Sequence, residues 1–137
     1  MTPATWSSKS ESDPLMSSSQ SQSRQQHESL QQKSCTPCEG EVSPLDPQQA
    51  QQYLQALPEW SLEEEGKIIS RKLNCGNFVK GVTLIQKIAE VAESEQHHPD
   101  LHLTGYRKLR VDLTTHAIGG LSENDFILAA KVDALID

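Results

Sequence analysis

Histidines cluster in one short part of this chain. Four of the five histidines fall between positions 97 and 116 of the 137 residues. His97 and His98 are adjacent and are followed by Pro99, which restricts the backbone, and His116 lies one predicted strand further on. Because imidazole both gives and takes a proton near neutral pH, such a group can supply both halves of a proton-transfer reaction. The pattern therefore predicts an acid–base pocket built from His97, His98 and His116.

A carboxylate and a fourth histidine flank this cluster. Glu93 precedes His97 by four residues, so the two side chains share one helix face if the helix extends that far. A carboxylate in that place would orient an imidazole, and we include Glu93 among the candidate catalytic residues. His102 follows in a segment expected to be extended, which would place its ring away from the pocket. We therefore leave His102 out.

Two other interpretations of the histidines stay open. Exposed histidines at the ends of helices and strands would only add solubility. Three histidines and a carboxylate could also bind zinc or non-haem iron. Since adjacent histidines do not easily aim both rings at one ion, we favour acid–base chemistry and expect neither a metal nor an organic cofactor.

The elements that must position these residues follow from periodicity and capping signals. Asp46 and Pro47 begin a helix that stops before Pro58, and Pro99 ends a second helix, so that His97 and His98 lie at or beyond its C-terminus. The expected elements are a helix over 47–57, a hairpin over 60–73, a helix over 77–96, strands over 101–106 and 109–113, and a helix from 122 to 137. The order α-β-β-α-β-β-α predicts a single-domain α+β fold, an antiparallel four-stranded sheet with three helices packed on one face.

The N-terminal part has a different composition. Residues 1–34 are mostly polar and contain few large apolar side chains, so we expect a disordered Ser/Gln-rich leader over 1–43 and one folded domain over 44–137. The leader contains a Cys-x-x-Cys pair, Cys35 and Cys38. A structural zinc site needs four ligands, and a redox pair would normally lie between a strand and a helix, so we favour a flexible joint.

Charge and hydropathy exclude several kinds of partner. The net charge is −7, and the acidic and basic residues of 1–34 cancel, so the excess negative charge belongs to the folded part. An acidic domain without a basic stripe does not attract nucleic acid. No apolar run is long enough to cross a bilayer. Three cysteines favour a reducing compartment, and we expect a cytoplasmic protein, with organellar targeting by residues 1–34 as the alternative.

Residues 93–125 resemble the pterin-4a-carbinolamine dehydratases. The resemblance rests on separated blocks in the right order: Glu93, then His97-His98-Pro99, Tyr106, Thr115-His116, and Gly120-Leu121-Ser122 with Asp125. Trp60 and Phe78 fit less specific upstream positions, so the likeness covers about residues 44–137. Unlike animal members, this chain has Leu101 where they have tryptophan, and one additional residue between Pro99 and Tyr106.

The resemblance implies dehydration of 4a-hydroxytetrahydrobiopterin to quinonoid dihydrobiopterin, which recycles the cofactor of the aromatic amino acid hydroxylases. On this view His97 and His116 flank the pterin and exchange protons with it, His98 holds it, and Glu93 orients a histidine. Further contacts to the pterin are expected from Pro99, Thr115, Ala117 and Ile118.

The resemblance also implies a homotetramer, a dimer of dimers. It leaves two alternatives to the enzyme: a non-catalytic dimerisation or coactivator module, and a pterin-binding protein of molybdopterin metabolism.

Overall fold

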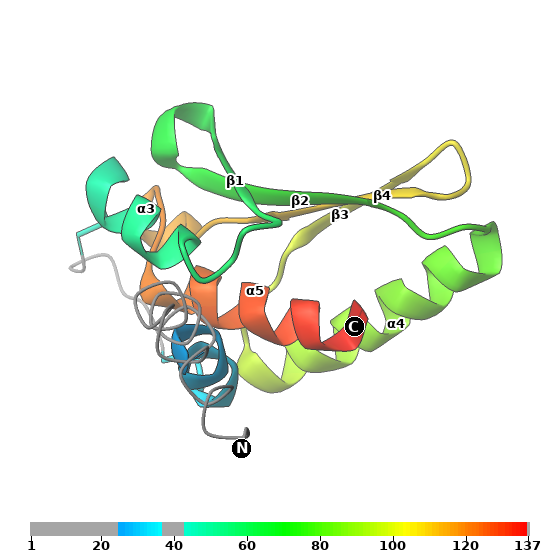
Figure 1. Cartoon of the computed structure of the whole chain (residues 1–137), viewed down its shortest axis with the longest axis horizontal. Helices are drawn as coiled ribbons and strands as arrows, with labels where there is room; N and C mark the ends of the chain where they lie inside the picture. The colour runs from blue at the N-terminus through cyan, green and yellow to red at the C-terminus, as the bar shows by residue number, and fades with distance from the viewer. Residues whose placement is uncertain (1–24, 37–42, 137) are drawn as a thin grey trace, which may run out of the picture.

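The structure is a computed structural model that describes residues 25–36 and 43–136. Four antiparallel strands form one open sheet in the order β1-β2-β4-β3. Helices α4 and α5 run side by side beneath one face of that sheet, and α3 lies near its β1 end (Figure 1). The predicted α+β class and the order of the predicted elements are confirmed. The elements are α3 Pro47–Leu54, β1 Ser61–Glu63, β2 Ile68–Asn74, α4 Phe78–Glu95, β3 Asp100–Thr104, β4 Lys108–Leu113 and α5 Glu123–Ile136, with short 3-10 turns η1 Glu64–Gly66 and η2 His116–Ile118.

The central strand β4 shows why the sheet forms where it does. Leu109, Val111 and Leu113 alternate with polar residues, and all three are buried on the face that the helices cover. In the register with β2, Leu113 lies opposite Ile69. The hairpin between β3 and β4 turns at Gly105 and Tyr106, which both have positive φ and so give the turn the twist that antiparallel strands need.

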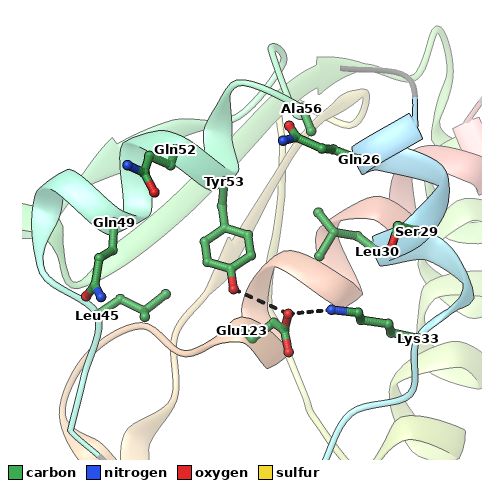
Figure 2. A pocket seen from close by; sticks show the side chains of 10 residues that line it. All are labelled: Gln26, Ser29, Leu30, Lys33, Leu45, Gln49, Gln52, Tyr53, Ala56 and Glu123. Atoms are coloured by element: carbon green, nitrogen blue, oxygen red, sulfur yellow. Dashed lines mark hydrogen bonds and ion pairs between the residues drawn. The ribbon is translucent and has the colours of Figure 1, made fainter. Parts of the chain in front are cut away.

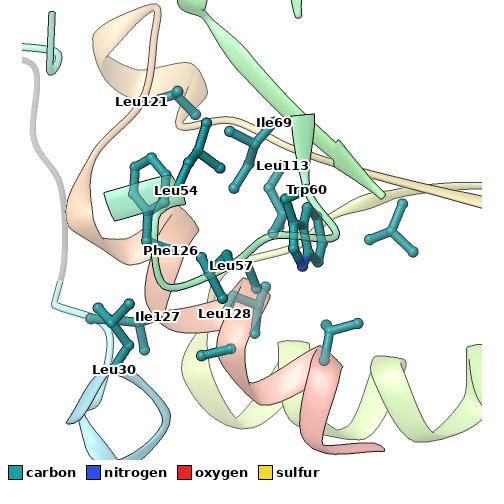
Figure 3. Close-up of a cluster of buried hydrophobic side chains, with 14 of the residues drawn as sticks. Leu30, Leu54, Leu57, Trp60, Ile69, Leu113, Leu121, Phe126, Ile127 and Leu128 are labelled. Carbon is teal, nitrogen blue, oxygen red and sulfur yellow. The ribbon is translucent and has the colours of Figure 1, made fainter. Parts of the chain in front are cut away.

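The core fills the space between the sheet and the helices. Trp60, Phe126 and Leu57 are its largest buried side chains near α3, and Figure 3 shows them converging with leucines and isoleucines of β2, β4 and α5. Tyr53 of α3 stacks on Phe126 of α5, with ring centroids 4.7 Å apart. These contacts hold the N-terminus of α5 in place, which matters because that terminus carries part of the site.

The two ends of the helices nearest the site are defined by capping groups. Helix α4 ends at Glu95, and Gln96 has φ 56°, a left-handed conformation that stops the helix before Pro99. The amide of His97 then donates to the carbonyl of Ala92 over 3.1 Å. At α5, the amide of Ser122 donates to Asp125 Oδ2 over 3.0 Å, the reciprocal half of a capping box.

Local structure differs from the prediction at three places. Strand β3 ends at Thr104 rather than at residue 106, because Gly105 and Tyr106 form the turn. Helix α3 ends at Leu54 rather than Leu57, because residues 56 and 57 donate to carbonyls three residues back and tighten the last turn. The described part of the expected disordered leader contains a helix over residues 25–32, and Leu30 in it is 5% exposed. That side chain joins the core cluster, so even a polar segment gains enough burial to dock. Residues 1–24 and 37–42 lie outside the described residues.

Candidate active site

A pocket of about 590 Å³ lies where the end of α4, the end of β4 and the N-terminus of α5 meet. Residues from four separate segments of the chain line it: Cys35, Thr36, Ser94, Glu95, Gln96, His97, His98, Thr114, Thr115, His116, Ala117 and Asn124. The three histidines singled out from the sequence therefore share one cavity. They reach it from two segments, the turn after α4 and the loop after β4.

His97 is the most constrained of these histidines. Its Nε2 lies 2.6 Å from Asp125 Oδ1, and its side chain is 12% exposed, whereas that of Asp125 is fully buried. The other carboxylate oxygen of Asp125 accepts hydrogen bonds from Thr115 Oγ1 over 2.8 Å and from the amide of Ser122. Because these groups donate to Asp125, its carboxylate acts as an acceptor, and Nε2 of His97 is the donor in their hydrogen bond.

His98 and Glu93 form an exposed pair at the rim of the pocket. His98 Nε2 lies 2.6 Å from Glu93 Oε2, and the two side chains are 58% and 73% exposed. Glu93 and His97 would share a helix face only if the helix reached His97, and that condition is not met, because α4 ends at Glu95 and Gln96 is left-handed. Glu93 reaches His98 instead, and the buried partner of His97 is Asp125.

His116 begins the 3-10 turn η2 after β4 and lines the same pocket as the residues at the end of α4. Thr115 pairs with Gly120 in an antiparallel bridge, which fixes the loop that carries His116. Within the described residues the His116 ring makes no hydrogen bond or ion pair, and the residue is exposed. Its ring nitrogens are therefore available to a bound molecule.

The remaining predicted contact residues divide into two groups. Thr115 and Ala117 line the pocket, whereas Pro99, Ile118 and Glu93 are not among its lining residues. His102, which the sequence analysis left out, lies on β3 with its Nε2 3.3 Å from Asp112 Oδ2, and it does not line the pocket.

Sequence reasoning missed the buried partner of His97 and several residues of the pocket wall. Asp125 was noticed only as a capping residue and a motif position, and nothing in its spacing relates it to His97 in particular. Cys35, Thr36 and Asn124 were not expected near the histidines at all. Burial, reinforced by the carboxylates of Glu95 and Asp125, raises the pKa of the Cys35 thiol to about 12, so the thiol stays protonated at neutral pH. The partner Cys38 lies outside the described residues.

A second pocket, of about 400 Å³, lies between helix 25–32, α3 and the start of α5 (Figure 2). Glu123 accepts hydrogen bonds there from Lys33 Nζ over 2.8 Å and from the Tyr53 hydroxyl over 3.3 Å. The figure shows the side chains of Lys33, Tyr53 and Glu123 meeting below that of Leu30. They fasten the N-terminal helix to the same end of α5 that carries Asp125.

The described part of the chain contains neither a metal-binding cluster nor a membrane-spanning helix. Among residues 25–36 and 43–136, no three histidine, cysteine, aspartate or glutamate side chains are grouped so that they could hold a metal ion. Within those same ranges, no helix is long and apolar enough to cross a membrane.

The fold and the pocket together define a class of protein: a small α+β domain with a pocket lined by three histidines. Comparison with known proteins makes the assignment specific. The family model described as pterin 4 alpha carbinolamine dehydratase matches residues 43–135, and the chain belongs to this family. The resemblance drawn from the histidine motif is therefore confirmed.

Individual relatives agree with this assignment. A Halorhodospira halophila protein, provisionally named pterin-4-alpha-carbinolamine dehydratase, is 51% identical over 107 residues, which are 78% of this chain and 97% of that protein. Pterin-4-alpha-carbinolamine dehydratase 2, mitochondrial, from Arabidopsis thaliana is 43% identical over 77% of this chain and 58% of its own length. The crystal structure of a transcriptional coactivator/pterin dehydratase from Brucella melitensis superimposes with a TM-score of 0.65 at 26% identity, covering 69% of this chain and all of the other. The names are those of hydro-lyases, the enzyme class that the sequence predicted.

Proposed function

We propose that this protein dehydrates 4a-hydroxytetrahydrobiopterin to quinonoid dihydrobiopterin and water, in the recycling of tetrahydrobiopterin. The observation that carries the proposal is the hydrogen bond between buried Asp125 and His97, because His97 lines the same pocket as His98 and His116. Membership of the dehydratase family supports the same reaction.

The reaction needs one acid and one base. The C4a–O bond breaks as the hydroxyl oxygen takes a proton and leaves as water, and the N5–H bond gives up its proton so that its electron pair forms the C4a=N5 double bond. A positioned side chain contributes about 10²–10⁴-fold to each such proton transfer. Both steps are within the reach of imidazoles, and the atoms balance without an oxidant or reductant.

His97 is suited to the role of base. Because Nε2 donates to Asp125, Nδ1 carries the lone pair, and the buried carboxylate stabilises the imidazolium that forms when Nδ1 takes the N5 proton. In our assignment His116, whose ring has no partner among the described residues, enters as the acid and protonates the leaving hydroxyl. Solvent then returns both rings to their starting states.

The other predicted residues bind the substrate. His98, oriented by Glu93, would hold and polarise the pterin at the rim, while Thr115 and Ala117 would contact it from the loop after β4. Pro99 and Ile118 support the turns that carry the histidines, and in our assignment they contact the pterin only at the edge of the site.

Turnover by the purified full chain tests the proposed function. Stopped-flow absorbance should show synthetic 4a-hydroxytetrahydrobiopterin dehydrating well above its uncatalysed rate when micromolar protein is added. A rate equal to the uncatalysed one, with pterin binding detected by fluorescence quenching, would favour a pterin-binding protein of molybdopterin metabolism.

A coactivator module is the second candidate function. The Brucella melitensis protein, which shares this fold, is named both a transcriptional coactivator and a pterin dehydratase. That candidate predicts capture of a partner protein by the full chain without turnover of the 4a-hydroxypterin, so the same turnover measurement separates it from the enzyme.

Assembly and location belong to the same proposal. We expect a homotetramer, and the 55% and 71% exposed side chains of Phe78 and Val79 at the start of α4 offer apolar surface for subunit contact. Light scattering tests this, since a monomer would contradict it. We place the protein in the cytoplasm. The Arabidopsis relative is named mitochondrial, so a fluorescent fusion of the full chain that accumulates in an organelle would overturn this placement.

A further inference from the structure

Residues 33–36, here called the strap, run from the N-terminal helix to the mouth of the histidine pocket. Cys35 and Thr36 line that pocket, on the side formed by α4 and α5. The amide of Cys35 donates to Glu95 Oε1 over 2.7 Å, and its Sγ lies 3.6 Å from the carbonyl of Asn124. The strap is therefore fixed to both helices that frame the site.

Asn124 holds the strap by two bonds at once. Its Oδ1 accepts from the Thr36 amide over 3.0 Å, and its Nδ2 donates to the Thr36 carbonyl over 2.5 Å. The side-chain amide of Asn124 thus bonds to both the backbone amide and the backbone carbonyl of Thr36, as the backbone of a neighbouring β-strand would. Asn124 is 5% exposed and precedes Asp125, so the residue that holds the strap is adjacent to the residue that orients His97.

The first residue of the strap and the helix before it are anchored to α5 as well. Lys33 bonds to Glu123, Lys131 Nζ donates to the carbonyl of Gln31 over 2.8 Å, and His27 Nε2 lies 3.4 Å from Asp133 Oδ2. Figure 2 shows the Lys33 end of this arrangement. These contacts, spaced along α5, hold the N-terminal helix against α5 and keep the strap beside the pocket.

We propose that the strap is a wall of the pterin site, that Cys35 and Thr36 contact the bound pterin, and that Asn124 is the positioning residue that keeps them there. This inference rests on the proposed function, because it takes the pterin to bind among His97, His98 and His116. According to this proposal the strap contributes to substrate binding, whereas the histidines donate and accept the protons.

Cysteine labelling tests the contact directly. The full chain is treated with iodoacetamide with and without saturating 7,8-dihydrobiopterin, and modification of the Cys35 and Cys75 peptides is followed by mass spectrometry. Cys75 lies outside the pocket and serves as the internal control. We expect the pterin to slow modification of Cys35 at least fivefold and to leave that of Cys75 unchanged. Equal rates at Cys35 with and without bound pterin would overturn the proposal.

Substitution of Asn124 tests the positioning role. Asn124→Ala removes both bonds to Thr36, and we expect KM to rise about five- to twentyfold, kcat to change less than threefold, and alkylation of Cys35 to accelerate. Asn74→Ala, at the end of β2 and outside the site, is the matched control and should leave all three unchanged. A folded Asn124→Ala protein with wild-type KM, or one that loses only kcat, would contradict the role.

The two proposals fail in different ways. If the proposed function is wrong, the wild-type protein does not dehydrate the 4a-hydroxypterin. If only the strap proposal is wrong, wild-type turnover is intact while Cys35 is unprotected and the KM of Asn124→Ala is normal.

Discussion

Asp125 Oδ1 lies 2.6 Å from His97 Nε2, and the carboxylate is completely buried behind the ring. The two residues are far apart in the chain and come from the start of α5 and the turn after α4. Thr115 and the amide of Ser122 donate hydrogen bonds to the other oxygen, Oδ2, so Oδ1 is the oxygen that accepts the hydrogen bond from His97. This relationship fixes which nitrogen of His97 carries a proton.

Replacing Asp125 by asparagine should therefore impair catalysis more than stability. The Asn oxygen would take over the bonds from Thr115 and Ser122, and the Asn amino group would then face Nε2 and force the proton of His97 onto Nδ1. We expect kcat to fall about 10²–10⁴-fold, the range of a lost general base. Stopped-flow turnover measures this, with circular dichroism as the check on folding. A kcat within threefold of wild type would contradict the assigned tautomer.

The exposed pair at the rim should matter much less. Glu93→Gln weakens the contact to His98, but both side chains are largely solvated, and exposed ion pairs contribute about 0–1 kcal/mol. We expect kcat/KM to fall by no more than about fivefold, the equivalent of 1 kcal/mol. His102→Ala, on β3 outside the pocket, is the control and should leave kcat/KM at the wild-type value. A loss of a hundredfold or more in Glu93→Gln would mean that Glu93 acts in the chemistry itself.

The Cys35 thiol gives a prediction about pH. Its pKa is raised by burial to about 12, whereas an unfolded cysteine ionises near pH 8.5. Between these values the unfolded chain loses its proton first, so the stability that the neutral thiol provides is present below pH 8.5 and is lost as pH rises toward 12. The rate of alkylation of Cys35 at pH 9 should be lower in the folded protein than in urea. In the folded protein this rate should rise with pH up to pH 10.5 without reaching a plateau. A plateau near pH 9 would contradict this.

A buried charge cluster away from the pocket gives a prediction about stability. Asp133, whose side chain is 7% exposed, accepts hydrogen bonds from Trp60 Nε1 over 2.9 Å and from Arg71. Asp133→Ala leaves the buried guanidinium without its counter-charge, and we expect a loss of about 3–5 kcal/mol in the free energy of unfolding. Urea denaturation followed by tryptophan fluorescence measures it. Asp100→Ala, exposed on β3, is the control, and a loss in Asp133→Ala below 1 kcal/mol would be the contrary result.

Much of the fold could be predicted because it depends on local signals. The alternation in β4, the Asp46 cap and the stop before Pro99 each act over a few residues, and each predicted element exists. The helix over residues 25–32 was missed because composition averages over a segment. Its docking depends on one buried leucine and on contacts to α5, which leave no local pattern.

The site was predictable in part for the same reason. The histidines are recognisable by residue type and spacing, but the identity of their partners is a property of the tertiary structure. Helix α4 ends at Glu95, and the left-handed turn at Gln96 brings His98 rather than His97 to Glu93. Likewise, Asn124 is an ordinary first-turn helix residue until the strap lies against it.

The central claim is that His97 and His116 act as base and acid on one pterin. The most direct measurement is single-turnover dehydration of 4a-hydroxytetrahydrobiopterin by the His97→Ala and His116→Ala proteins, each shown to be folded and to bind 7,8-dihydrobiopterin. We predict that each variant loses about 10²–10⁴-fold in rate, as expected when one positioned proton-transfer group is removed. Wild-type rates in either variant would contradict the account.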